Sequence, residues 1–297
     1  MRALVVAKEI AKNLLMGAPA FRRLRSRWRG GRTTGRLDVP AALAEVRKTV
    51  ELYLSRLEGA GYSREFVKGA SVLEVGPGAN AGVALCLLAL GARRVFLVDR
   101  FADLQCRDRE RELYRALLAP AELPSALRDR LVAEAMDPSA AANEHIRFVH
   151  APVESLALAE PVDLVVSRYV LQHLSDIGAA FDRFSALISP SGLMTHYVDV
   201  ETLGPLNPGG VAPLALLELS PRTWNWMGGH RGLTNQARLG SYLAHLARAG
   251  FRLKRLEIAK RMPMGAVAAA RPRLHAAFRG CSDEDLAALH FSFVAAR

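Results

Sequence analysis

A glycine-rich turn and a more distant carboxylate carry the clearest chemistry in this sequence. The run Glu74-Val75-Gly76-Pro77-Gly78 joins an apolar segment at 71–75, typical of a strand, to a helix-like segment at 81–90. Glycines let a ligand approach the backbone closely, and the start of a helix adds free N–H groups and a partial positive charge. Asp99 ends the next expected strand, where a carboxylate can accept two hydrogen bonds from ribose hydroxyls. Together these features predict a site for an adenosine-containing cofactor.

The charges around the turn distinguish between two such cofactors. The dinucleotide fingerprint G-x-G-x-x-G requires a third glycine at position 81, where this chain has Ala81. Glu74 stands two residues before the first glycine, and its carboxylate would repel a pyrophosphate. The same carboxylate can anchor the ammonium end of a sulfonium amino acid. The pattern therefore favours S-adenosylmethionine over NAD.

Four motifs, in order along the chain, resemble those of the class I S-adenosylmethionine-dependent methyltransferases. They are the turn at 74–78, the strand-end acid Asp99, the apolar strand and short helix at 162–174, and the turn Ser189-Pro190-Ser191-Gly192. The resemblance runs from about residue 70 to 200 and continues more weakly to 297. It implies S-adenosylmethionine as cofactor and a Rossmann-like α/β fold. In that fold a seven-stranded, mostly parallel sheet of order 3-2-1-4-5-7-6 has helices on both faces, and strand 7 is antiparallel.

The resemblance also implies which residues hold the cofactor. These are Glu74, Gly76, Pro77, Gly78, Asp99, Arg100, Val153, Glu154 and Ser167. Two positions depart from the family pattern. Asn80 stands where a third glycine is frequent, and Pro152 stands where an Asp usually meets the adenine amine. We therefore expect the backbone N–H of Val153 to hold the adenine, with Glu154 nearby.

Residues for the acceptor side follow from the chemistry of methyl transfer. The reaction is an in-line displacement in which the protein supplies alignment, and a base is needed only if the acceptor loses a proton. Candidate catalytic residues are His173, Tyr197 and Asp199, and candidate substrate-binding residues are Tyr169, His196 and Trp224. Packing roles are the alternatives for His173, His196 and Trp224. No group of acids and histidines has metal-ligand spacing, so no metal site is expected.

Alternating apolar strands and helices position these residues, as in a parallel sheet covered on both faces. The expected strands are 71–75, 95–99, 146–150, 162–167, 193–198, 251–258 and 290–295. The expected helices are 40–60, 81–90, 177–187 and 236–249, with a long polar helical region at 103–143. Regions 103–143 and 200–233 are expected to be insertions near the ligand edge. The second is rich in Gly, Pro, Asn and Trp, which suggests a lid over the acceptor.

The net positive charge of the chain is concentrated near its N-terminus. Residues 1–36 hold ten basic residues and one acid, whereas the remaining 261 residues carry a net charge of only +2. We expect a basic N-terminal arm at 1–36 with a helix at 4–15, a glycine-rich hinge at 30–35, a helical segment at 37–69 and a methyltransferase domain at 70–297. The arm could contact an acidic surface, either membrane or nucleic acid, or it could be a solvated helix that docks on its own domain.

The remaining composition narrows the class of protein. No apolar run reaches the roughly 18 residues needed to span a bilayer. The three cysteines form no CxxC pair, which argues against a disulfide framework or a zinc ribbon and favours a cytoplasmic protein, at most peripheral at a membrane through its arm.

The expected function is methyl transfer from S-adenosylmethionine to an oxygen or nitrogen of a small molecule or sugar. One alternative is methylation of RNA or protein that binds to the basic arm. The other is a non-catalytic module that binds the cofactor without turnover. The sequence assigns neither the acceptor atom nor an oligomeric state.

Overall fold

A seven-stranded sheet forms the centre of the computed structural model, which describes residues 2–17, 37–101, 104 and 106–297. The strand order β3-β2-β1-β4-β5-β7-β6 is the order expected from the sequence. The strands are β1 Ser71–Val75, β2 Arg94–Asp99, β3 Ile146–His150, β4 Val162–Arg168, β5 Ile188–Asp199, β6 Arg252–Arg261 and β7 Ala288–Ala296. Neighbours from β3 to β5 pair in parallel, whereas β7 is antiparallel to β5 and to β6. The expected Rossmann-like fold is confirmed.

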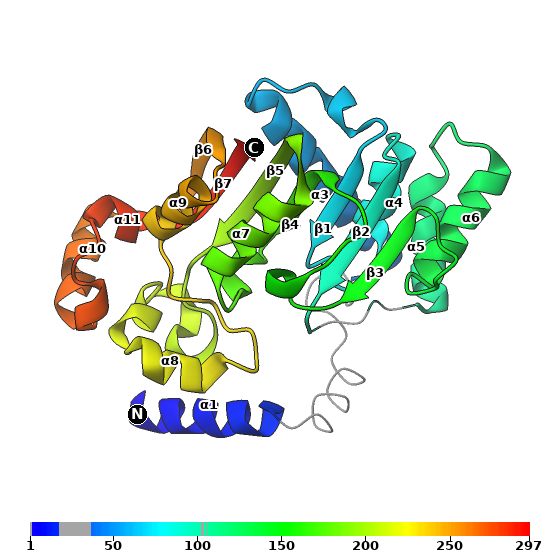
Figure 1. Ribbon diagram of the computed structural model, residues 1–297. Helices are drawn as coiled ribbons and strands as arrows, with labels where there is room; N and C mark the ends of the chain where they lie inside the picture. Colours follow the sequence, from blue (N-terminus) through cyan, green and yellow to red (C-terminus); the bar gives the residue numbers. More distant parts are fainter. Residues whose placement is uncertain (1, 18–36, 102–103, 105) are drawn as a thin grey trace.

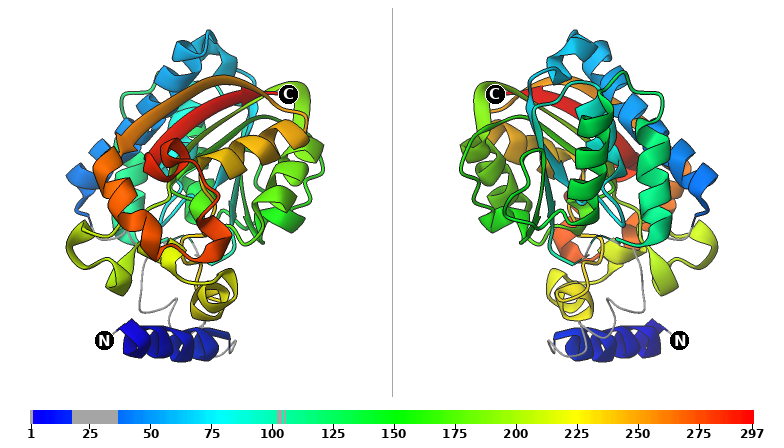
Figure 2. Two further views of the ribbon diagram at one scale, coloured as in Figure 1. Left: turned by 90° about the vertical axis from the view of Figure 1, so that its left-hand side faces the viewer. Right: turned by 90° about the vertical axis from the view of Figure 1, so that its right-hand side faces the viewer.

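Helices cover both faces of the sheet (Figures 1 and 2). One layer contains α3 Val39–Gly59, α4 Gly82–Ala89, α5 Asp108–Leu118 and α6 Ser125–Met136, and the other contains α7 Ile177–Leu187 and α9 Leu239–Arg248. Successive strand residues point to opposite faces, so Val72 packs in the first core and Leu73 in the second. Both residues are fully buried, as expected for a sheet covered on both sides.

The region 103–143 belongs to the helical layer rather than to the ligand edge. It forms the connection from β2 to β3 through α5 and α6, and Leu113, Tyr114 and Leu131 are buried in the first core. Most polar residues of the two helices are exposed or half-buried, whereas Glu110 and Glu134 are buried.

Two elements begin three or more residues away from the position expected from the sequence. β5 begins at Ile188 rather than at 193, because Ile188 pairs with Val162 across a register shift before the regular ladder resumes. α9 begins at Leu239 rather than at 236, and Arg238 is its N-cap. The side chain of Asn235 precedes the helix. It accepts the N–H of Ala237 and donates to the carbonyl of Leu171.

A smaller third core lies beyond the end of the sheet. It joins the segment 200–233, which includes α8 Pro221–Gly228, to α10 Met264–Ala270 and α11 Asp283–Ala287. Helix α1, Arg2–Gly17, rests against α8 as the element farthest from the sheet (Figures 1 and 2). The helical part of the basic arm is thus confirmed. The expected hinge at 30–35 and the arginine-rich stretch at 21–36 lie outside the described residues. None of the described helices is both long and apolar enough to cross a bilayer.

Candidate active site

The turn after β1 requires glycine at two positions for different reasons. Gly76 and Gly78 have φ angles of 70° and 77°, a region that side chains rarely adopt. A β-carbon at Gly76 would lie 2.4 Å from Cγ2 of Val170, whereas one at Gly78 would meet nothing within 4 Å. Gly76 therefore allows the turn to pack closely against the side chain of Val170. Gly78 leaves open space beside the backbone.

That open space belongs to a cavity of about 340 Å³ at the carboxyl ends of β1, β2 and β4. Eight of the residues expected from the sequence to form the site line this cavity: Gly76, Gly78, Asp99, Arg100, Val153, Glu154, Tyr169 and His173. The end of the segment 200–233 reaches this cavity as well, since Arg231 and Gly232 complete the wall. The cavity lies where ligands bind in sheets of this type.

Hydrogen bonds fix the rim of the cavity around Asp99. Its Oδ1 accepts the N–H of Phe101 at 2.7 Å, which holds the turn after β2. Arg100 donates to Oγ of Ser175 at 2.7 Å, and Glu154 accepts the Ser175 N–H at 3.1 Å. Glu154 therefore has a structural role in bracing the loop before α7.

Glu74 is a buried carboxyl with an unused oxygen. It is 4% exposed, and among the described residues its Oε2 has no hydrogen-bond partner. Burial raises the pKa of Glu74 to about 8. A hollow of about 80 Å³ adjoins it, also lined by Gly76, Pro77 and Tyr169, on the α3 side of the turn. An ammonium group in this hollow would satisfy the carboxylate, so the residues present fit the amino-acid end of S-adenosylmethionine.

Ser167 and His196 do not line the cavity. Both are fully buried on neighbouring strands, and Oγ of Ser167 lies 2.7 Å from Nδ1 of His196. The imidazole stacks on Phe184 and touches Phe293. Burial lowers the pKa of His196 to about 3. The side chains of Ser167 and His196, expected at the cofactor and the substrate, therefore face each other inside the core rather than the cavity, and Nε2 of His196 has no hydrogen-bond partner among the described residues.

Trp224 is likewise a core residue rather than a cavity residue. It is 8% exposed, packs in the third core, and donates its indole N–H to the carbonyl of Thr234 at 2.7 Å. The segment 200–233 therefore reaches the cavity through Arg231 and Gly232 and not through this tryptophan.

Helix α1 supports this cavity wall. Glu9 forms an ion pair with Arg231 at 2.5 Å, and both side chains are largely buried. Asn13 accepts the N–H of His230 at 2.9 Å and donates to the carbonyl of Trp226 at 3.0 Å. Sequence reasoning did not find these contacts. The one available signal was that Glu9 is the single acid in an otherwise basic arm.

Tyr169 joins the cavity to a second group of polar side chains. Its φ angle is 59°, and it is the one residue other than glycine with a positive φ in the described part of the chain. Backbone in this region is strained for a bulky residue. The Tyr169 ring meets the Tyr197 ring edge-on, with centroids 5.0 Å apart. The Tyr197 hydroxyl in turn lies 3.3 Å from Nδ1 of His290.

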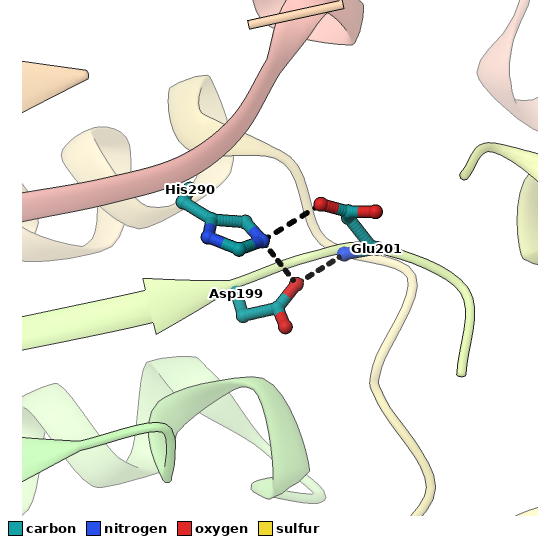
Figure 3. Close-up of side chains that lie close together, drawn as sticks. All are labelled: Asp199, Glu201 and His290. Carbon is teal, nitrogen blue, oxygen red and sulfur yellow. Dashed lines mark hydrogen bonds and ion pairs between the residues drawn. The ribbon is translucent and has the colours of Figure 1, made fainter. Parts of the chain in front are cut away.

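His290 is a candidate that the sequence did not suggest. Its Nε2 lies 3.2 Å from Asp199 Oδ1 and 2.7 Å from Glu201 Oε1 (Figure 3). The antiparallel register places His290, at the start of β7, opposite Asp199 at the end of β5. That register was the available signal, because an antiparallel partner begins where its neighbour ends.

Electrostatics set the protonation of this cluster. Burial favours neutral imidazole, but the hydrogen bond to Asp199 and the charges of Asp199 and Glu201 raise the pKa of His290. Burial also opposes ionisation of Asp199, yet the hydrogen bond from His290 and the N–H of Glu201 lower its pKa. Burial, with Tyr169 nearby, raises the pKa of Tyr197 to about 12, so this phenol stays protonated at neutral pH.

The ligand atoms of Asp199, Glu201 and His290 lie within 4.8 Å of one another, a set that linear spacing did not reveal. A metal ion could be held at such a distance, but Lys260 already pairs with Glu201 and His290 bridges the two carboxylates. The charges in the cluster are thus balanced by side chains.

A family model described as a methyltransferase domain matches residues 46–256. No curated protein sequence matches the chain significantly. Among solved structures, an S-adenosylmethionine-dependent methyltransferase from Mesorhizobium loti is 18% identical, with 80% of this chain and 100% of that chain covered and a TM-score of 0.44. Magnesium protoporphyrin IX methyltransferase from Synechocystis PCC 6803 is 15% identical, with coverage of 93% and 92% and a TM-score of 0.46. An N-methyltransferase from Bradyrhizobium japonicum WM9 is 14% identical, with coverage of 85% and 96% and a TM-score of 0.40.

The family model spans most of the chain, and the matched region includes the turn, the strand-end acid and the cavity. The chain belongs to the methyltransferase domain family and is a class I enzyme that uses S-adenosylmethionine.

Proposed function

We propose that this enzyme methylates an oxygen or nitrogen of a small molecule or sugar, with the cofactor lying across Gly76–Gly78. In this arrangement Asp99 accepts the ribose hydroxyls, Glu74 pairs with the ammonium group, and the adenine lies beside Val153. The open space at Gly78 and the unused oxygen of Glu74 support these positions.

A small acceptor fits the surroundings of the cavity better than a nucleic acid. Arg231 and Gly232 wall the cavity on the side away from the sheet, and the chain outside residues 1–36 carries a net charge of only +2. Two arginines at the cavity are already occupied, since Arg231 pairs with Glu9 and Arg168 with Glu45. Nucleic-acid binding requires cations free to meet phosphates, and two of the three arginines that line the cavity are paired with carboxylates, Arg100 being the third.

The contact between Tyr197 and His290 carries the proposed mechanism. Neither residue lines the cavity, and Tyr197 adjoins it through the ring of Tyr169, which does. When bound, the sulfonium cofactor supplies the activated methyl group. As the acceptor loses its proton, the Tyr197 hydroxyl takes it and passes its own proton to Nδ1 of His290. Nε2 of His290 lies beside the carboxylates of Asp199 and Glu201, whose charges stabilise the imidazolium that forms.

Methyl transfer with isotopically labelled S-adenosylmethionine tests this function on a panel of phenols, sugars and amines, with RNA and denatured protein as competing acceptors. We expect label in a small acceptor. Tyr197→Phe and His290→Gln should lower kcat by about 10²–10⁴-fold, the usual contribution of acid–base catalysis, while S-adenosylhomocysteine still binds.

His245→Gln on α9 is the matched control and should keep wild-type turnover. Label found in RNA or protein alone would overturn the acceptor class. Full turnover in both Tyr197→Phe and His290→Gln would overturn the proton route. In that case His173, which also lines the cavity, becomes the next residue to replace.

A further inference from the structure

Helix α1 is apolar on its outer side as well as on its inner side, where Val6 and Ile10 pack against the third core and Met16 is buried. Its polar residues Glu9 and Asn13 are only 3% and 4% exposed, because they face the protein and pair with it. Its leucines face outward: Leu4, Leu14 and Leu15 are 78%, 69% and 56% exposed. Surface helices of soluble proteins normally have polar residues on the side that faces away from the protein.

The outward residues form one continuous sector. At about 100° per residue, Leu4, Leu14 and Leu15 fall on the same side of the helix, with two exposed alanines between them, Ala7 and Ala11. We call these five residues the outer face of α1. No described element covers this face, since α1 is the outermost element in all three views (Figures 1 and 2).

The charges beside the outer face are all positive. Lys8 and Lys12 border it on one side, and the sector itself contains no acid. Lys8 is exposed, and Lys12 is paired with Glu9 but keeps 47% of its side chain exposed. Helix α8, against which α1 packs, adds Trp226, which is 54% exposed. The guanidinium of Arg222 lies 5.0 Å from the centre of the Trp226 ring. The sequence at 18–36 continues with seven arginines and no acid.

An apolar face with lysine neighbours complements a surface that is anionic outside and apolar beneath. A bilayer with anionic lipids has this chemistry, and amphipathic helices lie in its interface with apolar side chains buried and lysines at the headgroups. Nucleic acid is negatively charged but has no apolar layer in which the exposed leucine side chains could be buried. We propose that the outer face of α1 docks the enzyme on an anionic membrane surface.

Docking would also orient the enzyme. Because Glu9 and Asn13 tie α1 to the segment 226–231, a bilayer under the outer face lies on the side of the cavity walled by Arg231. This inference concerns the surface alone and holds whichever acceptor the enzyme uses.

Flotation of the full chain with lipid vesicles tests the proposal. Vesicles of phosphatidylcholine alone are compared with vesicles that also contain phosphatidylglycerol. We expect binding to the anionic vesicles that weakens with salt, and at least a tenfold loss for the double variant Leu14→Glu/Leu15→Glu. A tenfold loss corresponds to about 1.4 kcal/mol, which the lost burial of two leucines readily accounts for.

A matched control carries the same added charge on the opposite edge of the molecule. Leu90→Glu/Leu253→Glu also replaces two exposed leucines, 42% and 41% exposed, and should bind vesicles as the wild type does. S-adenosylhomocysteine binding checks that each variant is folded, because none of these residues lines the cavity.

Three results would overturn the proposal. The first is equal vesicle binding by Leu14→Glu/Leu15→Glu and the wild type, or none by either. The second is a dimer in solution that Leu14→Glu/Leu15→Glu dissociates, because the outer face would then cover a second copy of the chain. The third is tighter binding to RNA than to anionic vesicles that survives Leu14→Glu/Leu15→Glu.

Discussion

Glu9 and Arg231 form a largely buried ion pair between the first helix and the wall of the cofactor cavity, with 2.5 Å between Oε2 and Nη1. Lys12 contacts the other oxygen of the same carboxylate, so Glu9 receives a cation on each side. Burial alone would raise the pKa of Glu9, yet these two partners together lower it. The carboxylate is therefore ionised in the fold, and α1 is a part of the site.

Removing either partner should loosen the cavity wall. We expect Glu9→Gln and Arg231→Met each to destabilise the protein by about 1.5–3 kcal/mol, the scale of hydrogen bonds to charged groups. The double variant should lose less than the sum of the two, because each single change leaves the other group unpaired. Urea unfolding of the four proteins measures this coupling. Strictly additive losses would mean that the pair contributes nothing.

Gly76 should tolerate no side chain unless Val170 is shortened. Gly76→Ala places a β-carbon against Cγ2 of Val170 at a φ angle of 70°, so S-adenosylhomocysteine binding should be lost. Gly76→Ala/Val170→Ala removes the overlap and should recover part of the affinity, with the backbone strain of about 1–2 kcal/mol remaining. Calorimetric titration compares the two, and wild-type affinity in Gly76→Ala would contradict the described turn.

Cofactor affinity should depend on the protonation of Glu74. Its pKa is about 8 in the free protein, and a bound ammonium group lowers it, so binding at neutral pH releases a proton. S-adenosylhomocysteine should therefore bind more tightly as the pH rises from about 6 to about 8. Calorimetry in buffers of different ionisation enthalpy detects the proton. Glu74→Gln should bind more weakly and lose the dependence, whereas equal slopes in both proteins would remove Glu74 from the site.

The same carboxyl should affect stability in the opposite direction. Because the folded pKa of Glu74 lies above the unfolded value, the folded state binds more protons between about pH 4.5 and 8. Its contribution is complete below this window and is lost as the pH rises through it. Without ligand, Glu74→Gln should therefore flatten the fall in the free energy of unfolding over that range, as urea titrations at several pH values can measure.

Turnover should fall on the acidic side as His290 takes up a proton before reaction. Its pKa is raised above the ordinary 6.5, so the acidic limb of the kcat profile should lie above that value. Asp199→Asn removes the main cause of the shift and should move the limb to lower pH while lowering kcat. A limb that stays in place in Asp199→Asn would show that another group titrates.

Local patterns were enough to predict much of the fold. Strands β1 and β3 and helix α7 have the expected bounds, because a short apolar run or a single amphipathic period ends at a clear breaker. The sheet order came from the resemblance to a known family. The glycine turn and Asp99 were found because each directly follows or ends an apolar run typical of a strand, and the residue types at these positions indicate their chemistry.

Side-chain direction inside buried strands could not be predicted in the same way. In a sheet covered on both faces, both sides of a strand are apolar, so the sequence does not tell which side meets the ligand. Ser167 and His196 lie on the same side of adjacent strands and pair with each other. Trp224 has a polar edge that a core carbonyl satisfies, which composition alone does not reveal.

Contacts between distant segments were missed for a different reason. Asp199 meets His290 through the antiparallel pairing of β5 and β7, and Glu9 meets Arg231 through the docking of α1 on α8. Neither pair has a spacing that marks it. Both depend on how elements pack, so they appear only when the tertiary structure is known.

The central claim is that the cofactor lies in this cavity with its ribose on Asp99. Calorimetric titration of S-adenosylhomocysteine into the wild type, Asp99→Asn and Asp99→Ala tests it most directly, with NAD as the comparison ligand. We predict binding by the wild type, no heat with NAD, and an affinity about 10- to 150-fold lower in both variants, equivalent to about 1.5–3 kcal/mol. Wild-type affinity in a folded Asp99→Ala variant would contradict the account.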